Sequence, residues 1–286
     1  MKQKFGIFDV IVYTVMIIVL LITVYPFIYV AAVSFSDSTY IVQNKVSFYP
    51  RGFNINAYRM ILESPTIPRA YMNTIIYTAA GVFFNMLFTI TMAYPLSKKY
   101  LKGKGFVTTL VVITMFFNGG IIPNYLVVRN FHLLDSMWAL IIPNAIWTFE
   151  LLILKSFFES MPEEIYEAAR IDGASEFRVL LNIAIPLSKA AIASVSLFYA
   201  MGHWNSFFLP MIYISSMNKL PLQVVLRDML MQDTLKTSST IGDYSSLTPM
   251  AVKNATIFIS LIPMLLLYPF IQRFFTKGLM LGAVKG

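Results

Sequence analysis

The stretch VIVYTVMIIVLLITVYPFIYVAAVSF, residues 10–35, contains no Asp, Glu, Lys or Arg. The apolar core of a bilayer is about 30 Å thick, and about 20 residues of helix cross it. The stretch meets that length, and it exceeds the roughly 7–15 apolar residues of a secretory signal peptide. No A-x-A cleavage site follows it. We therefore expect a retained membrane-spanning helix here.

Five further apolar stretches meet or nearly meet the same length. They are residues 70–97, 105–128, 136–154, 190–218 and 254–272. Glu150 interrupts one of them, and a charge at the centre of a bilayer costs roughly 2.5–3.5 kcal/mol on insertion scales. We expect Glu150 near a helix end or facing protein. The sequence thus predicts an all-α integral membrane protein with six transmembrane helices.

The composition agrees with a membrane protein and excludes several other classes. Charged residues make up 13% of the chain, against about 25% in soluble domains. The net charge of +8 does not indicate nucleic-acid binding, because the basic residues fall between apolar runs. The chain has no cysteine, which excludes disulfides, thiol catalysis and cysteine-based metal sites. We expect no metal site and no catalytic residue.

The basic residues of the short loops and the chain ends predict the orientation. These residues are Lys2, Lys4, Lys98, Lys99, Lys102, Lys104, Arg273, Lys277 and Lys285, whereas the third loop holds only Arg129. Because basic residues favour the cytoplasmic side, both termini, the second loop and the fourth loop (residues 155–189) are predicted to be cytoplasmic. The long polar loops at residues 36–69 and 217–253 then face outward, and we expect short surface helices in them.

The fourth loop has the start and stop signals of two short helices. Ser160 is a candidate N-cap, and Glu163 is placed to complete a capping box with it. Gly173 follows Asp172 as a stop signal. Ser175 is a candidate cap of a second helix, which must end or kink near Pro186. The loop therefore predicts a helix, a sharp bend and a second helix.

The first of these two helices is acidic. Glu163, Glu164 and Glu167 carry its charge, with Arg170 as its only base. The alternative is an amphipathic helix pair on the membrane surface, but such helices are usually rich in Lys and Arg. The small side chains of Ala168 and Ala169 allow another backbone to come close. We therefore favour a docking element for another protein.

The spacing in this loop resembles the EAA loop of ABC importer permeases. That family pattern is E-A-A, three residues, G, nine residues and I-x-L-P. Here it is met by Glu167-Ala168-Ala169, Gly173 and Ile183-Ala184-Ile185-Pro186, with Ile185 where leucine is usual. Further segments that resemble the family are residues 93–97, 117–123, 134–138, 202–205 and 277–286. The resemblance covers residues 70–286 and is closest to the maltose-type, carbohydrate-uptake branch, particularly its oligosaccharide permeases.

This resemblance implies a type I ABC importer permease fold with the EAA loop as the cytoplasmic coupling helix. It implies an N-terminal helix and extracytoplasmic loop at 1–69, a core of five spans at 70–276, and a cytoplasmic tail at 277–286. The residues implied to couple to an ATPase are Glu167, Ala168, Ala169, Asp172, Gly173, Ile183 and Pro186. Glu167 would pair with a base of the ATPase, and Gly173 would provide the bend.

The resemblance also implies the partners. No G-x-x-x-x-G-K-[ST] phosphate loop is present, so ATP and Mg²⁺ are expected on a separate polypeptide. The expected complex holds a second homologous permease, two copies of a cytoplasmic ATPase and an extracytoplasmic sugar-binding protein, in a bacterial cytoplasmic membrane. The tail, with Lys277, Gly278, Gly282 and Lys285, is expected either to insert between the ATPase subunits or to fray.

One polar cluster, His203-Trp204-Asn205, lies within an otherwise apolar span. Aromatic and amide side chains bind sugars in clefts, and polar residues inside a membrane are functional candidates. We therefore consider this cluster a possible substrate path. The alternative is hydrogen bonding between helices.

Two rival functions are disfavoured. An ion-coupled carrier would place ionisable residues near the midplane of the membrane, and only Glu150 comes close. An intramembrane enzyme would need catalytic residues in a motif, but the chain has no H-E-x-x-H and no G-x-S-x-G. Its two histidines, His132 and His203, lie far apart in sequence. The sequence therefore predicts an ATP-driven sugar importer subunit that is not itself an enzyme.

Overall fold

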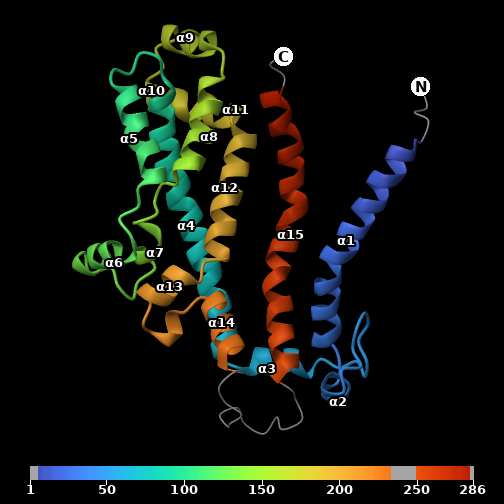
Figure 1. Ribbon diagram of the computed structural model, residues 1–286. Helices are drawn as coiled ribbons and strands as arrows, with labels where there is room; N and C mark the ends of the chain where they lie inside the picture. The colour runs from blue at the N-terminus through green and yellow to red at the C-terminus, as the bar shows by residue number, and fades with distance from the viewer. Residues whose placement is uncertain (1–5, 233–248, 284–286) are drawn as a thin grey trace. The chain divides into compact units, whose positions relative to one another are not determined.

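The computed structural model describes residues 6–232 and 249–283, and it describes side chains over 6–232 and 249–266. Within these ranges the chain forms helices and turns and contains no β-strand. Figure 1 shows the helices in chain order. Contacts divide the chain into two compact units, one of Met1–Pro68 with Val225–Pro263 and another of Arg69–Val224 with Met264–Gly286.

The first unit is built around α1 (Ile7–Ser34) and the loop that follows it, with α2 (Ser38–Val42) and α3 (Asn56–Glu63). Aromatic stacking folds this loop back on the end of α1. The ring of Phe35 lies 5.6 Å from Phe53 and 4.7 Å from Tyr58. Ser34 and Tyr58 share a hydrogen bond of 2.7 Å between their hydroxyl groups. The short helices expected within residues 36–69 are thereby confirmed.

The second unit contains most of the remaining helices. In chain order they are α4 (Thr66–Ser97), α5 (Lys104–Phe116), α6 (Ile121–Asn130), α7 (Trp138–Ile141), α8 (Thr148–Glu159), α9 (Glu163–Ile171), α10 (Glu176–Val179), a π turn (Leu180–Ala184), α11 (Ile185–Leu187), α12 (Lys189–Trp204), α13 (Phe208–Tyr213) and a 3₁₀ turn (Met217–Lys219). The helices α14 (Leu222–Gln232) and α15 (Pro249–Ala283) follow and run across the boundary between the two units.

The core of the second unit lies between α4, α8 and α12. Leu151, Leu154 and Val195 are fully buried there. Tyr199 is also buried, and its hydroxyl group is 2.7 Å from that of Thr89. This bond satisfies two polar groups away from water. Because Thr89 belongs to α4 and Tyr199 to α12, it also fixes the register of these two helices.

Among the residues whose side chains are described, three helices are long and apolar enough to cross a membrane: α1, α4 and the Pro249–Leu266 part of α15. The number rises to five if two bent pairs are each counted as one span, namely α5 with α6, bent by 116°, and Glu176–Leu187 with α12, bent by 83°. The predicted count of six is therefore not confirmed.

The predicted span at 136–154 is not one continuous helix. It consists of the short α7, a break, and α8, which begins only at Thr148. Pro143 lies in the break and has no N–H to continue the helical hydrogen bonds. Glu150 lies in the first turn of α8 and is buried, so the expectation that it lies near a helix end or faces protein is confirmed.

The predicted span at 105–128 is divided in the same way, at Asn118-Gly119-Gly120 between α5 and α6. Gly120 has φ of 87°, which a glycine adopts at little cost. The side-chain oxygen of Asn118 accepts a hydrogen bond of 2.9 Å from the backbone N–H of Gly120. This turn chemistry makes the bend a feature of the sequence rather than a distortion.

Asp135 fastens the loop between α6 and α7 to the segment after α13. Its carboxylate accepts hydrogen bonds from the backbone N–H groups of Ser215 and Ser216 at 3.0 and 2.9 Å. It also accepts from the Ser216 hydroxyl and the Lys219 ammonium, both at 2.7 Å. The bond from Lys219, followed by those from Ser216, holds the pKa of Asp135 well below its usual range. The ionised carboxylate is therefore the form that joins the two segments.

Candidate functional site

The acidic helix of the fourth loop begins later than its sequence signals suggested. Ser160 is the C-cap of α8, with φ of −78° and ψ of −9°, and its hydroxyl donates to the Phe157 carbonyl at 2.8 Å. An N-cap residue instead needs an extended backbone. Pro162 occupies the N-cap of α9 and provides no side-chain cap. The predicted capping box from Ser160 to Glu163 is therefore wrong, because the preceding helix uses this serine.

The bend after α9 is a Schellman motif. The N–H of Ala174 donates to the carbonyl of Ala169 at 2.9 Å, and the N–H of Gly173 donates to that of Arg170 at 3.0 Å. This motif needs a left-handed residue, usually glycine, and Gly173 has φ of 76°. The predicted sharp bend at Gly173 is confirmed.

The second part of the loop also follows its signals. Ser175 caps α10, and its side chain accepts from the N–H of Arg178 at 3.4 Å. The chain then continues through the π turn and α11, which holds Pro186, before the 83° bend that leads into α12. The predicted second helix with a kink near Pro186 is confirmed, although it is divided into three short pieces.

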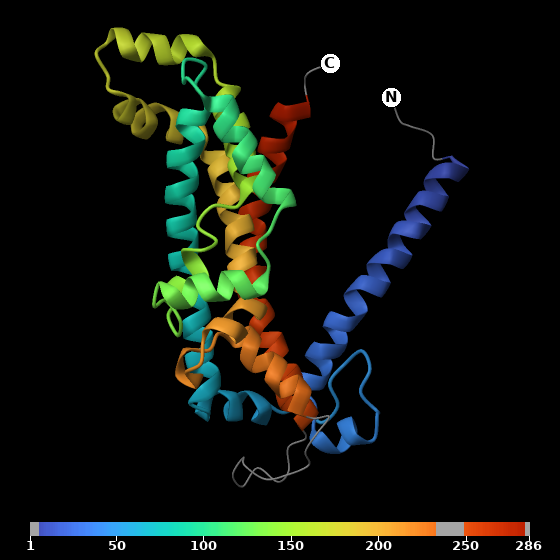
Figure 2. The ribbon, with the colours of Figure 1, turned by 60° about the vertical axis from the view of Figure 1, so that its left-hand side comes forward.

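The two faces of α9 have different surroundings. Tyr166 and Ala169 point inward and are buried in the core of the second unit. The exposed residues of the outer face are Glu164, Ile165, Glu167, Ala168, Ile171 and Asp172. Ile171 is 85% exposed, an unusual position for a large apolar side chain at the end of a helix. In Figures 1 and 2, α9 lies across the ends of α4 and α8.

The residues expected to couple to an ATPase are therefore divided between these two environments. Glu167, Ala168, Asp172, Gly173 and Pro186 are exposed, Ile183 is half-buried against the core, and Ala169 is buried within this chain. Glu167 and Ala168 are thus available to another protein, whereas Ala169 is already covered by its own fold.

Charged contacts attach both ends of α9 to neighbouring residues. Lys99 donates a hydrogen bond to Glu163 and lowers the pKa of that carboxyl group. Arg170 donates to Glu176 at 3.0 Å and lies over the Tyr100 ring. Because Arg170 is the only base of α9 and is used in this way, the outer face of the helix presents acidic charge.

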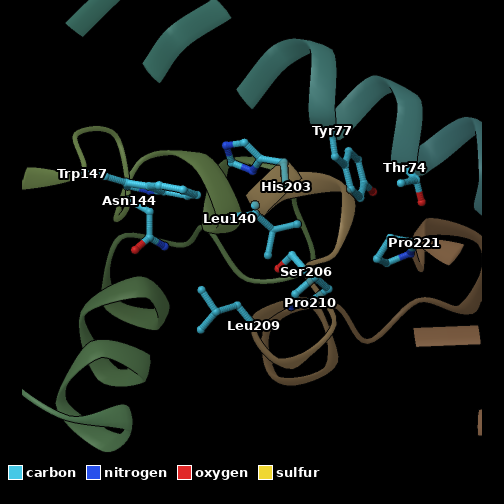
Figure 3. A pocket seen from close by; sticks show the side chains of 11 residues that line it. Thr74, Tyr77, Leu140, Asn144, Trp147, His203, Ser206, Leu209, Pro210 and Pro221 are labelled. Atoms are coloured by element: carbon cyan, nitrogen blue, oxygen red, sulfur yellow. The ribbon is translucent and has the colours of Figure 1, made fainter. Parts of the chain in front are cut away.

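A second candidate region is a cavity of about 130 Å³ between α4, α12 and the loops near α7 and α13. Figure 3 shows its lining. The lining residues are Thr74, Tyr77, Leu140, Asn144, Trp147, Gly202, His203, Ser206, Leu209, Pro210 and Pro221. Hydroxyl, amide and aromatic groups thus share the cavity wall with apolar side chains.

An amide holds His203 in this wall. The Nε2 atom of His203 lies 2.7 Å from Oδ1 of Asn85, a residue of α4. The Nδ2 group of Asn85 donates to the carbonyls of Asn144 and Ala145 at 2.6 and 2.9 Å. Asn85 therefore joins α4, α12 and the segment after α7. The sequence reasoning missed Asn85, although an amide within a charge-free span is itself a signal of contact between helices.

Close packing fixes the aromatic part of the wall. Gly202 accepts the Trp147 ring so tightly that a Cβ atom there would lie 2.8 Å from Cζ3 of the ring. The Trp147 ring also lies 4.9 Å from the ring of Tyr199, and its backbone N–H donates to the Tyr199 hydroxyl at 3.1 Å. The sequence reasoning missed Trp147, because only the fold brings it beside His203.

Of the cluster His203-Trp204-Asn205, only His203 lines this cavity. Trp204 is buried, with its ring edge-on to Tyr71 at 5.7 Å. The side chain of Asn205 donates to the carbonyl of Met201, one turn earlier in its own helix, at 2.9 Å. The structure therefore places Trp204 and Asn205 away from the cavity wall.

The remaining expected residues lie near the C-terminus. Lys277, Gly278 and Gly282 belong to α15, whose side chains are described only as far as residue 266, and Lys285 lies outside the described residues. In the ranges with described side chains, no group of three His, Cys, Asp or Glu residues could hold a metal ion.

Two of the relatives that comparison with known proteins gives are from Bacillus subtilis. The chain is 43% identical to protein LplC over 268 residues, covering 93% of this chain and 90% of LplC. It is 40% identical to YtcP, a polygalacturonan/rhamnogalacturonan transport system permease protein, over 290 residues that cover 99% of this chain and all of YtcP. No protein-family model matches the chain.

A solved structure is also similar to this chain. It comes from a bacterial ABC transporter involved in the import of the acidic polysaccharide alginate. The TM-score is 0.90, the identity is 30%, and the match covers 96% of this chain and 100% of the other. The similarity thus spans both units of the chain.

Proposed function

Because the chain belongs to the permease family of ABC importers for oligosaccharides and polysaccharides, we propose that it forms half of a sugar translocation path and couples to a separate ATPase through α9. The chain is a membrane-embedded transport subunit and not an enzyme. ATP and Mg²⁺ are bound by the partner ATPase. The rest of the proposed complex is a second, homologous permease, a second ATPase copy and an extracytoplasmic sugar-binding protein.

The outer face of α9 is the observation that carries this proposal. It combines exposed apolar side chains, Ile165 and Ile171, with the acidic residues Glu164 and Glu167. An apolar centre with a charged rim is typical of protein interfaces, and a single sign of charge selects a partner of the opposite sign. Ala168 leaves room for close approach between them. This surface suits a basic-rimmed cleft on a cytoplasmic ATPase.

Docking of the ATPase on α9 requires the fourth loop to lie in the cytoplasm of a bacterial cell, and we propose that both termini lie there too. The end of α15 and the residues after it, including Lys277, Gly278, Gly282 and Lys285, would then lie on the ATPase side. We propose that this tail inserts between the ATPase subunits.

The substrate proposal rests on the cavity and the relatives. YtcP is named for polygalacturonan and rhamnogalacturonan, and the similar solved structure for alginate. Each of these is an acidic polysaccharide, so we propose an oligosaccharide of this class as substrate. His203, Tyr77 and Trp147 offer hydrogen-bonding and aromatic surface at the cavity, as sugar sites require.

Charge reversal on α9 tests the docking. Glu167→Lys should lower the amount of ATPase that co-purifies with the permease complex by about tenfold or more, because like charges across an interface cost several kcal/mol. Uptake of a labelled oligogalacturonide into membrane vesicles should fall with it. Glu167 is exposed, so the permease itself should still fold and insert.

A matched reversal on another helix provides the control. Glu63→Lys changes an exposed residue of α3, whose described partner is Arg59, and should leave ATPase retention unchanged. Normal retention and uptake in the Glu167→Lys complex would contradict the assignment of α9 as the docking helix.

A further inference from the structure

Lys98, the first residue after α4, is buried although it is a lysine. The residue is only 6% exposed, and its Nζ atom has no hydrogen-bond partner within the described part of the chain. Burial lowers the pKa of Lys98 to about 8, so the group is still mostly cationic at neutral pH. A buried cation needs a compensating partner, because removing it from water is costly.

Two tyrosine rings compensate this charge. The Nζ atom lies 4.2 Å from the centroid of the Tyr94 ring and 3.0 Å from that of Tyr166. The faces of aromatic rings attract cations, and they do so more strongly away from water. Tyr94 belongs to α4 and Tyr166 to the inner face of α9, so the ammonium group joins two elements. We call Lys98, Tyr94 and Tyr166 the lysine clamp.

The other charged attachments of α9 are more exposed. The Lys99 side chain is 79% exposed in its pair with Glu163, and Arg170 and Glu176 are both partly exposed. Ion pairs in contact with water contribute little to stability. Glu176 has a further role, since it accepts a hydrogen bond of 2.9 Å from the Tyr94 hydroxyl and orients that ring. The lysine clamp is therefore the buried electrostatic link between α9 and α4.

The helix α4, which ends directly before Lys98, also reaches the cavity. Asn85 of α4 bonds to His203, and Tyr77 and Thr74 of α4 line the cavity wall. A displacement at one end of a continuous helix moves the side chains along it. α4 is thus a physical connection between the coupling loop and the cavity.

We propose that Lys98 is a positioning residue that fixes α9 to the end of α4, so that a displacement of α9 moves the α4 side chains at the cavity. This inference rests on the proposed docking of an ATPase on α9. The clamp lies on the inner face of α9, whereas Glu167 and Ile171 lie on the outer face, so the clamp and the docking can be altered separately.

A single cysteine in the cavity reports the movement. The chain has no cysteine of its own, and Ser206 lines the cavity, so Ser206→Cys gives one reactive position in this chain, and labelling is measured on this subunit after the subunits are separated. The rate of its reaction with a maleimide is measured in the whole complex purified from its native membrane, with and without ATP and vanadate. The amount of ATPase in the same preparation is measured alongside.

In the parent complex, ATP and vanadate should change this rate by about fivefold or more, the low end of usual coupling between sites. Lys98→Met keeps the length of the side chain and removes its charge, and Tyr166→Leu removes a ring. Both should abolish the response while the ATPase remains bound. Tyr166→Phe keeps the ring and loses only a hydroxyl group that contacts the Met161 sulfur, so it should respond like the parent.

Lys102→Met is the matched control, since Lys102 is an exposed lysine of the same loop, and it should respond like the parent. A normal response in Lys98→Met with the ATPase bound would overturn the clamp and leave the docking proposal standing. A loss of assembled complex, with an unchanged response in the complex that remains, would also overturn the clamp. A parent complex without any response would also overturn it. Full ATPase retention in Glu167→Lys would instead overturn the docking, and the clamp with it.

Discussion

At the scale of single residues, the structure separates Trp204, which the sequence singled out as a possible substrate contact, from Trp147, which it did not. Trp204 is buried and packs against Tyr71 in the interior of the second unit. Trp147 is half-buried and forms part of the cavity wall beside His203. The residue type is the same, but one ring is available to a substrate and the other is not.

Alanine at each tryptophan should therefore have a different effect. Trp204→Ala should lower the amount of folded complex, because truncation of a buried tryptophan costs about 3–5 kcal/mol, while uptake per assembled complex stays unchanged. Trp147→Ala should change uptake per assembled complex, since it removes an aromatic surface from the proposed sugar path. Both quantities are measured on one preparation with a labelled oligogalacturonide.

Asn205→Ala is the control for this pair, because its exposed side chain bonds only within its own helix among the contacts described. It should change neither quantity. Unchanged uptake per complex in Trp147→Ala would remove the cavity from the sugar path, and a changed value in Trp204→Ala would place Trp204 on it.

At the scale of elements, turn chemistry decides where the helices of the second unit end. Gly120 and Gly173 have positive φ and mark the bend after α5 and the end of α9. Asp135 also has a positive φ, 56°, and joins the loop before α7 to the segment after α13. These short connections determine which helices become neighbours.

The Asp135 connection predicts a dependence of stability on pH. Its folded pKa is below the unfolded value of about 3.9, so the stabilisation is fully present above that value and is lost as pH falls below it. The unfolding temperature of the purified protein in detergent should therefore fall more steeply between pH 5 and pH 3 in the parent than in Asp135→Asn.

Asparagine is a close match for this test, because it also tolerates a positive φ, so the substitution removes the charge and keeps the backbone. At pH 7, Asp135→Asn should unfold at a lower temperature than the parent. Parallel pH profiles of the two proteins would show that the carboxylate does not hold the loop.

At the scale of the whole molecule, apolar surface dominates. Residues along α1 such as Ile11, Leu21 and Ile22 are more than half exposed within this chain. A bilayer is the environment in which such a helix needs no further cover, because its backbone hydrogen bonds are all internal. The basic residues of the loops predict the orientation in that bilayer.

Single cysteines test this orientation. Ser175→Cys lies at the exposed start of α10, and Ser47→Cys lies in the exposed loop between α2 and α3. In intact cells, a membrane-impermeant maleimide should react with Ser47→Cys and leave Ser175→Cys unlabelled until the membrane is opened. Labelling of Ser175→Cys from outside would contradict the predicted orientation and would show that α9 is not in the cytoplasm.

The sequence by itself determined the class of the protein and the chemistry of its fourth loop. Long uncharged stretches require a membrane, and the bend at Gly173 and the cap at Ser175 depend on contacts between residues a few positions apart. Local chemistry of this kind can be read without knowing the fold. It was misleading at Ser160, because two neighbouring helices compete for one residue there.

Only the tertiary structure brought distant residues together. Asn85 with His203, Trp147 with Gly202, and Lys98 with Tyr166 are each separated by more than fifty residues in the chain. Apolar periodicity indicates how long a helix can be, but it carries no information about which face meets which neighbour. Side-chain packing between helices makes that choice, because an interior must be filled and its polar groups satisfied at the same time.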